Sequence, residues 1–312
     1  MTVRKTQGLV AAPFTPMRAD GTLHLELIDA YARRLHTDGV VGAFICGTTG
    51  EGMSLSVNER RQVAERWVAA APSGLRVMVH VGHNSPGDSQ ALAAHAASIG
   101  ADSFATLAPS FFRSSAVDAL VDWCAHVAAA APALPFYYYH MPSMTGVTVR
   151  VIDFLRRAAP RIPNLAGVKY TFEDLDDFHR CLTFEDGRFD VLFGRDELLL
   201  SALRLGARGA VGSTYNFMPG LYRRLIACFE RGDEAAAREL QERAVRIIEA
   251  CATTGAHPIV VFKSLMRRHG IDCGPPRLPL AAATPAQVTA LAAKLAAADA
   301  AEWLPPETAP AF

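Results

Sequence analysis

Lys169 is the side chain in this sequence best suited to act as a nucleophile, because it closes the otherwise apolar segment 166–170. An amine carried into an apolar interior is desolvated, which favours its neutral form. A neutral amine can form a Schiff base with a ketone. Lysine is also scarce here, since only four of the 31 basic residues are lysines: Lys5, Lys169, Lys263 and Lys294.

The alternative role for Lys169 is a structural salt bridge to one of three acidic residues that follow other predicted strands: Glu51, Asp196 or Glu197. The other lysines offer less chemistry. Lys5 lies near the N-terminus, and Lys263 and Lys294 fall on predicted helices, where solvated faces suit them. We therefore favour a catalytic role for Lys169 over the salt bridge.

A glycine-rich turn follows the apolar run 41–46, and its sequence is Gly47-Thr48-Thr49-Gly50-Glu51-Gly52. Two glycines that bracket two hydroxyls give a tight turn whose backbone N–H groups and hydroxyls could hold a carboxylate or a phosphate. The turn does not match GxGxxG, and it lacks the Lys-Ser/Thr pair of a nucleotide phosphate loop. An ordinary turn whose threonines satisfy the backbone is the alternative.

Three tyrosines and a histidine end another run, at Tyr137, Tyr138, Tyr139 and His140. Alternation along a strand sends Tyr137 and Tyr139 to one side and Tyr138 to the other. A tyrosine at the mouth of a barrel can pass protons. For any single tyrosine, however, aromatic packing is the common role, and a lone histidine is more often structural than a base.

Two further strand ends are polar and contain glycine: Gly194-Arg195-Asp196-Glu197 and Gly212-Ser213-Thr214-Tyr215-Asn216. Such ends suit hydrogen bonding to a polyhydroxylated substrate, although Asp196 could instead cap the helix that follows it. We expect no metal site, because the pair His80-x-x-His83 has no HExxH or carboxylate pattern around it.

These residues are positioned by short apolar runs that alternate with helical periodicity. Eight runs read as buried parallel strands: 9–12, 41–46, 76–81, 103–107, 135–139, 166–170, 189–193 and 209–212. One helical pattern between them starts with a Ser56–Glu59 capping box and buries one side through Val63, Ala64, Trp67 and Val68. Other helical patterns lie at 88–99, 116–131, 149–158, 174–183, 196–205 and 220–231. The order predicts a (β/α)8 TIM barrel, with an open doubly wound sheet as the alternative.

The barrel closes near residue 231 in this prediction, giving a barrel domain over 1–231 and a C-terminal helical bundle packed on it over 232–312. Helical periodicity continues beyond the barrel at 233–253, 258–269 and 285–298. In a (β/α)8 barrel the active site lies at the carboxyl ends of the strands. All the polar strand ends described above would therefore meet at one mouth.

Charge and cysteine content narrow the class of protein. The 31 basic and 31 acidic residues balance, which speaks against a nucleic-acid partner. The six cysteines are scattered with no CxxC pair, so reduced thiols in a cytoplasmic protein are expected. The apolar run 8–12 is too short for a signal sequence, and no segment reaches transmembrane length, so no membrane association is expected.

Taken together, the motifs resemble the pyruvate-dependent class I aldolases of the dihydrodipicolinate synthase and N-acetylneuraminate lyase superfamily, over essentially the whole chain. The marks of the superfamily are the turn 47–51, Lys169 and Gly274-Pro275-Pro276-Arg277-Leu278-Pro279. Segments 136–146, 169–171, 194–197 and 212–216 are similar to the N-acetylneuraminate lyases, especially the vertebrate-type form. The resemblance implies reversible cleavage of N-acetylneuraminate to pyruvate and N-acetylmannosamine by a homotetramer.

Carried over residue by residue, the resemblance makes Lys169 the Schiff-base residue and Tyr139 the residue that shuttles a proton as the C3–C4 bond breaks. Thr48 and Thr49 would bind the substrate carboxylate, and Thr48 would be a catalytic residue together with Lys169 and Tyr139. The sugar hydroxyls would be held by Thr171, Gly194, Asp196, Glu197, Gly212 and Ser213. No cofactor or metal is implied, because the protonated imine is itself the electron sink.

Two positions depart from relatives in the superfamily. Dihydrodipicolinate synthases place an arginine five residues after the catalytic tyrosine, and here that residue is Met144, which speaks against that activity. Many bacterial relatives complete a proton relay with a tyrosine near the fourth strand, where this chain has Ser110-Phe111-Phe112. We expect Thr48 and Tyr139 to use water or the substrate carboxylate instead.

Alternative functions remain open from the sequence. Another 2-keto-3-deoxy sugar-acid aldolase or dehydratase would share everything except the sugar contacts. A sugar-acid-binding regulatory protein would have no need of a buried amine. A nucleotide-binding oxidoreductase would need the glycine fingerprint that this sequence lacks.

Overall fold

The computed structural model describes residues 4–305 and shows eight parallel strands closed into a barrel in sequence order. The strands are β1 Gly8–Ala11, β2 Gly42–Ile45, β3 Arg76–His80, β4 Ser103–Leu107, β5 Phe136–His140, β6 Leu165–Tyr170, β7 Asp190–Phe193 and β8 Gly209–Gly212. Closure of β8 onto β1 confirms the predicted (β/α)8 barrel and excludes the open sheet. Each predicted strand end lies within one residue of the observed one.

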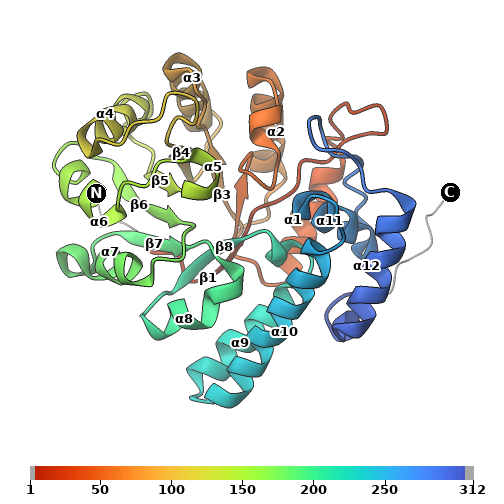
Figure 1. Ribbon diagram of the computed structural model, residues 1–312. Coiled ribbons are helices and arrows are strands. Elements are labelled where there is room, and N and C mark those ends of the chain that lie inside the picture. Colours follow the sequence, from red (N-terminus) through yellow and green to blue (C-terminus); the bar gives the residue numbers. More distant parts are fainter. Residues whose placement is uncertain (1–3, 306–312) are drawn as a thin grey trace.

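Helices surround the barrel, as Figure 1 shows. They are α1 Leu27–Thr37, α2 Val57–Ala70, α3 Pro86–Ser98, α4 Val117–Ala128, α5 Pro142–Thr145, α6 Val151–Ala158, α7 Leu175–Gly187, α8 Leu199–Arg204 and α9 Pro219–Glu230. The capping box predicted for α2 is present, because Ser56 Oγ accepts from the N–H of Glu59 and Glu59 Oε2 accepts from the N–H of Ser56. On the face predicted to be buried, Val63, Ala64 and Trp67 are buried, whereas Val68 is only partly buried.

Helix α1 was missing from the sequence prediction, although its signal is in the sequence. Ile28, Tyr31, Ala32 and Leu35 are buried, and their spacing is that of one helical face.

The segment 196–205 was predicted as one helix. It forms a 3-10 turn at Asp196–Leu198 followed by α8, which places Asp196 directly at the strand end.

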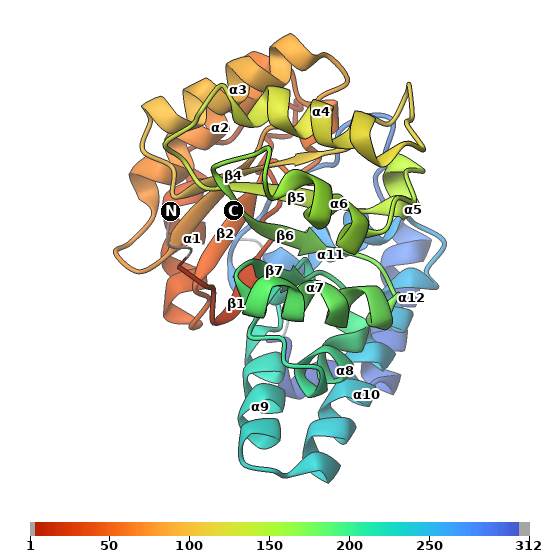
Figure 2. The same cartoon turned by 90° about the vertical axis from the view of Figure 1, so that its left-hand side faces the viewer.

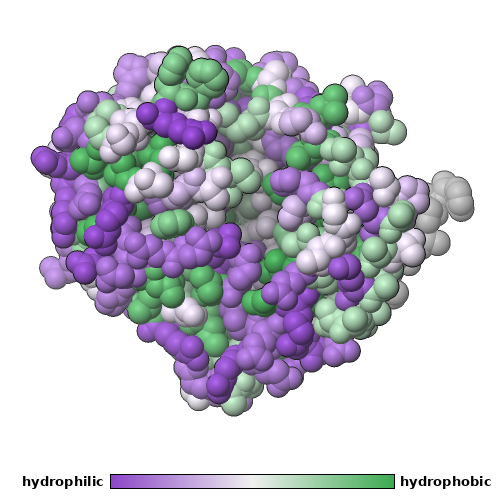
Figure 3. Space-filling model, in the orientation of Figure 1, coloured by the Kyte–Doolittle hydropathy of each residue, from purple (hydrophilic) through white to green (hydrophobic). Residues whose placement is uncertain are grey.

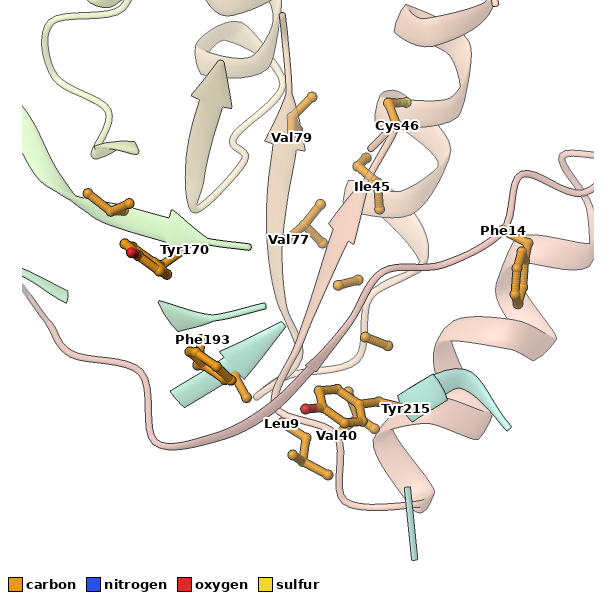
Figure 4. Close-up of a cluster of buried hydrophobic side chains, with 14 of the residues drawn as sticks. Leu9, Phe14, Val40, Ile45, Cys46, Val77, Val79, Tyr170, Phe193 and Tyr215 are labelled. Atoms are coloured by element: carbon orange, nitrogen blue, oxygen red, sulfur yellow. The ribbon is translucent and has the colours of Figure 1, made fainter. Parts of the chain in front are cut away.

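The barrel has two apolar layers. Inward-facing residues such as Val10, Phe44 and Leu192 fill the interior of the barrel. Outward-facing residues of the same strands pack under the helices, and Figure 4 shows Ile45 and Val77 among them. Each large apolar side chain fully buried in this way contributes roughly 1.5–3 kcal/mol of hydrophobic stabilisation. The strands that carry the polar ends are therefore held rigidly.

Three helices follow the barrel: α10 Glu234–Ala252, α11 Pro258–Leu265 and α12 Pro285–Ala297. Helix α10 packs against α9, and both views show the two helices side by side (Figures 1 and 2). Residues of α10, α11 and α12 belong to the same apolar cluster as the outer barrel layer. The division at residue 231 remains a proposal, and residues 1–3 and 306–312 of the predicted domains lie outside the described part.

Hydrophilic and hydrophobic side chains are interspersed over the face shown in Figure 3. Among residues 4–305, no helix combines the length and the apolar character needed to cross a bilayer. The six cysteines are all buried and free.

Candidate active site

The predicted site residues lie at the carboxyl ends of five strands, around one mouth of the barrel. Tyr139 and Lys169 are on β5 and β6, and Gly212 ends β8. The remaining residues follow a strand directly or within four positions: Thr48, Thr49, Thr171, Gly194, Asp196, Glu197 and Ser213. The barrel topology therefore brings together residues that are as much as 165 positions apart, from Thr48 to Ser213.

Lys169 projects into the barrel interior and is only 5% exposed. In the register of β5 and β6 it pairs with Tyr139, so the two side chains emerge next to each other. The Nζ atom lies 3.7 Å from the centroid of the Tyr139 ring and 4.4 Å from that of Phe44. The negative faces of aromatic rings attract a cation, and this attraction serves a protonated imine as well as an ammonium.

The salt-bridge alternative for Lys169 is not observed. Within residues 4–305, no carboxylate lies close enough to form an ion pair with Lys169. Of the three acidic residues considered, Glu51 pairs with Lys263, Asp196 binds Thr214, and Glu197 lies 3.9 Å from the Arg195 guanidinium. The absence of a carboxylate partner for this buried amine favours a chemical role over a structural one.

Tyr139 carries a hydroxyl that contacts the glycine-rich turn. Its OH lies 3.3 Å from Thr48 Oγ1 and 2.9 Å from Met141 Sδ. The predicted alternation along β5 is confirmed, since Tyr137 and Tyr139 belong to the interior layer and Tyr138 to the outer layer. Tyr137 donates to buried Asp190, so it has a structural partner, whereas Tyr139 faces the lysine.

His140 has a structural role, as expected for a lone histidine. Its ring packs against Tyr170 and Phe172 on the outer side of the barrel. Burial lowers the pKa of this imidazole to about 4, so the ring is neutral near pH 7. His140 therefore supplies no charge to the mouth of the barrel.

The glycine-rich turn closes on itself through two backbone hydrogen bonds. The N–H of Glu51 donates to the carbonyl of Thr48 over 3.0 Å, and the N–H of Gly52 donates to that of Gly47 over 3.1 Å. Thr49 is buried and Thr48 is partly buried beside Tyr139. The Thr48 hydroxyl thus lies beside the residue whose ring contacts Lys169, a place that suits recognition of a substrate carboxylate.

The prediction for Lys263 was wrong, because this residue lies in the interior rather than on a solvated face. Its side chain is 1% exposed, and its Nζ donates to Glu51 Oε1 over 2.7 Å. Helix α11 is short, and its face toward the glycine-rich turn carries the lysine. The rarity of lysine could have prompted the search for a buried partner, but the periodicity of an apolar helix does not say which polar residue is paired.

Asp196 is fully buried and is held by Thr214, whose N–H and hydroxyl both donate to Oδ2, over 3.1 and 2.5 Å. It does not cap the following helix, so that interpretation is wrong. Burial and the nearby charge of Glu197 raise the pKa of this carboxyl to about 6, against the hydrogen bonds from Thr214 and the charge of Lys169. A Cβ on Gly212 would lie 1.9 Å from Asp196 Oδ1, so only glycine fits beside this carboxyl.

Several buried polar atoms at this mouth have no hydrogen-bond partner among the described residues, namely Asp196 Oδ1, Thr171 Oγ1, His80 Nε2 and Arg195 Nε. Thr171 Oγ1 faces Gly194, where a Cβ would approach it to 2.1 Å. Buried polar groups are normally paired, so orphaned acceptors and hydroxyls at a strand end are suited to ligand hydroxyls. Glu197 is partly exposed at the rim.

His80, considered from the sequence only as half of a histidine pair for a metal, lies in the interior of the barrel. It ends β3, is 1% exposed, and lies edge-on to Tyr139 with 5.7 Å between ring centroids. Its Nδ1 is 3.0 Å from the Cys46 carbonyl. Burial, with the charges of Arg60 and Lys169, holds the pKa of His80 well below its usual range, so the ring is neutral. Alternation from Met78 could have placed His80 inside the barrel.

A cavity of about 470 Å³ opens beside Thr48, between the barrel mouth and the C-terminal segment. Its wall includes Asn84, Met144, His257 and Pro279. Groups of three or more His, Cys, Asp or Glu side chains that could hold a metal ion do not occur within residues 4–305. The chemistry available at this mouth is that of an amine, a phenol, hydroxyls and one carboxyl of raised pKa.

Comparison with known proteins agrees with this geometry. Residues 5–298 match the Dihydrodipicolinate synthetase family. N-acetylneuraminate lyase from Mus musculus is 47% identical over 300 residues, which are 95% of this chain and 93% of that protein. The enzyme of that name from Rattus norvegicus is 48% identical over 285 residues, 90% and 89% of the two chains. The solved structure of Proteus mirabilis N-acetylneuraminate lyase is 42% identical, with a TM-score of 0.91, over 95% of this chain and 99% of that one.

Proposed function

The chain belongs to the Dihydrodipicolinate synthetase family, and we propose that it is a class I aldolase that reversibly cleaves N-acetylneuraminate to pyruvate and N-acetylmannosamine, as the N-acetylneuraminate lyases it resembles are named for doing. It is a carbon–carbon lyase. Sequence identities of 47% and 48% to two N-acetylneuraminate lyases, each over most of this chain and of the lyase, support this substrate over other sugar acids. The sialic acid would meet the barrel mouth with its ketone at Lys169.

The reaction would begin with capture of the ketone. The amine of Lys169 attacks C2 of the open-chain sugar acid, and the carbinolamine takes up a proton from solvent and loses water to leave a protonated imine. Thr48 and Thr49, with the N–H groups of their turn, would hold the adjacent carboxylate. The rings of Tyr139 and Phe44 lie against the nitrogen and would stabilise the positive charge that forms there.

Cleavage would then depend on Tyr139. As its oxygen takes the proton of the C4 hydroxyl, the C3–C4 bond breaks, the aldehyde of N-acetylmannosamine forms, and the bonding electrons enter the imine to give an enamine. Tyr139 passes its own proton toward the substrate carboxylate, through Thr48 at 3.3 Å or water. Protonation of the enamine at C3 and hydrolysis of the imine release pyruvate and restore the amine.

The sugar end would be held by the polar ends of β6, β7 and β8. Thr171 Oγ1 and Asp196 Oδ1 are buried and unpaired among the described residues, so each could take a substrate hydroxyl. Glu197 at the rim would reach the distal hydroxyls, and Gly194, Gly212 and Ser213 would allow the chain of the sugar to approach the backbone. This assignment makes the sugar contacts separable from the imine chemistry.

The observation that carries the proposal is the burial of Lys169 beside Tyr139 without a carboxylate partner. The test is pyruvate release from N-acetylneuraminate, compared with release from a six-carbon 2-keto-3-deoxy sugar acid. The account predicts preference for N-acetylneuraminate. Preference for the shorter acid would assign the chain to a different aldolase, and Met144, which is half exposed at the cavity, already speaks against dihydrodipicolinate synthesis.

The proposal also covers the cofactors, the location and the oligomeric state of the protein. The imine serves as electron sink, so the proposed cycle uses no cofactor and no metal. A cytoplasmic location is supported by six cysteines that are free and buried. A homotetramer is supported by the family resemblance and by exposed Phe111 and Phe112 (75% and 86%), and light scattering on the purified protein tests it.

A further inference from the structure

We infer that the buried ion pair between Glu51 and Lys263 positions the glycine-rich turn for the substrate carboxylate, which makes Lys263 a positioning residue contributed by the C-terminal helices. The inference rests on the proposed function, because it takes the turn to be the carboxylate site. It concerns residues that touch neither the ketone nor the sugar.

The pair is closed off from solvent on both sides. Each side chain is 1% exposed, and Lys263 Nζ lies 2.7 Å from Glu51 Oε1. A second bond of the ammonium goes to the carbonyl of Pro275 over 2.8 Å. The other oxygen of Glu51 accepts from the backbone N–H of Arg277 over 2.5 Å. One carboxylate thus joins the turn to helix α11 and to the loop before α12.

Glu51 also has a backbone conformation that needs outside support. Its φ is 54° and its ψ is 29°, in the left-handed region that glycine prefers. A non-glycine residue stays in that region when surrounding contacts over-determine it. The contacts here are the two bonds of its carboxylate to Lys263 and Arg277.

This conformation sets the place of Thr48. The N–H of Glu51 donates to the carbonyl of Thr48, which closes the turn and leaves Thr48 Oγ1 3.3 Å from Tyr139 OH. A change at Lys263 would therefore be felt at the hydroxyls of the turn, while Lys169, which lies on β6 against two aromatic rings, keeps its place. A substitution at Lys263 should therefore weaken recognition of the substrate carboxylate and leave imine formation by Lys169 intact.

A buried ion pair is weak evidence for stability on its own, since apolar residues of similar volume often replace such pairs without loss. A purely stabilising role and a positioning role make different predictions. Loss of stability would affect every reaction of Lys169 alike. Loss of positioning would weaken the binding and trapping of ketones that carry a carboxylate, and would leave the trapping of ketones without one unchanged.

The experiment measures borohydride trapping of two ketones on the intact protein. Pyruvate carries the carboxylate, and acetone is the matched ketone without it. The variant is Lys263→Met, and the control is Lys294→Met, the same substitution at a C-terminal lysine whose Nζ donates to Thr253 instead of the turn. We expect Lys263→Met to raise the half-saturating pyruvate concentration at least tenfold, with acetone trapping within twofold of wild type and the control unchanged.

If Lys263→Met does not fold, as circular dichroism would reveal, the double variant Glu51→Gln/Lys263→Met leaves no unpaired buried charge and takes its place, with the same expected selectivity. Unchanged pyruvate saturation in either folded variant would overturn the inference, as would an equal loss for both ketones. Absence of trapping in the wild-type protein would overturn the proposed function and this inference with it.

Discussion

The Nζ atom of Lys169 lies 3.7 Å from the centre of the Tyr139 ring, and the two residues are paired in register on adjacent strands. The proposed nucleophile and the proposed proton carrier are therefore held by one stretch of backbone hydrogen bonds rather than by loops. Rigid placement of this kind supplies the orientation on which catalysis by proximity depends. It also allows the two roles to be separated by substitution.

Replacement of Tyr139 by Phe should lower the turnover of N-acetylneuraminate by about 10²–10⁴-fold, the range expected for loss of a positioned acid–base group. The ring that faces Lys169 is retained, so the pyruvate adduct should still form under borohydride. Steady-state pyruvate release and intact-protein mass measure the two effects. Turnover within tenfold of wild type would remove Tyr139 from the proton path.

The buried carboxyl of Asp196 should make stability depend on pH. Its pKa in the folded protein is about 6, above the usual 3.8, so the folded state binds the proton more tightly than the unfolded state does. The stability that this group contributes is therefore complete below pH 4 and is lost as the pH rises through 6. A shift of about two units corresponds to about 3 kcal/mol.

Asp196→Asn isolates this effect, because every other titrating group cancels in the comparison. From pH 4 to pH 8 the variant should gain up to about 3 kcal/mol in free energy of unfolding relative to wild type. Urea unfolding at each pH measures the difference. A constant difference across this range would show that the carboxyl titrates normally.

Gly212→Ala should impair sugar binding without affecting imine formation. The added Cβ would lie 1.9 Å from Asp196 Oδ1, so the carboxyl must move. We expect the KM for N-acetylneuraminate to rise at least tenfold while pyruvate trapping stays as in wild type. Gly220→Ala is the control, since a Cβ there meets no atom within 4 Å. Equal effects of the two substitutions would contradict the role given to Asp196.

Lys263→Met should also lower the free energy of unfolding, by about 3–5 kcal/mol, because it leaves the Glu51 carboxylate buried without its partner. Lys294→Met should change it by less than about 0.5 kcal/mol, as is usual for a surface substitution. Urea unfolding of both variants at pH 7 gives the comparison. Equal free energies of unfolding for the two variants would mean that Glu51 and Lys263 do not form a buried ion pair in solution.

The fold could be predicted because its signals are local. Short apolar runs bounded by glycine and polar residues marked all eight strands to within one residue. Alternation put Tyr137 and Tyr139 on one side of their strand, and that side is the interior of the barrel. Closure of the sheet followed from the count of strands. Helix α1 was not predicted, although the spacing of its buried residues is that of a helix.

The contacts across the molecule could not be predicted in the same way. The partner of Glu51 is 212 residues away, and periodicity reports which face of α11 is apolar but not which polar group it buries. His80 faces Tyr139 by its position on β3, yet a single histidine gives no distinctive sequence signal. Thr214 as the partner of Asp196 depends on the close approach of β7 and β8.

The most direct test of the account is to incubate the protein with N-acetylneuraminate, reduce it with borohydride and measure its intact mass, with Lys169→Ala treated in parallel. We predict an adduct of the mass of reduced pyruvate, mapped by peptide analysis to Lys169, and no adduct in the variant. An adduct on a different residue, or none in wild-type protein that is folded, would contradict Schiff-base cleavage at Lys169.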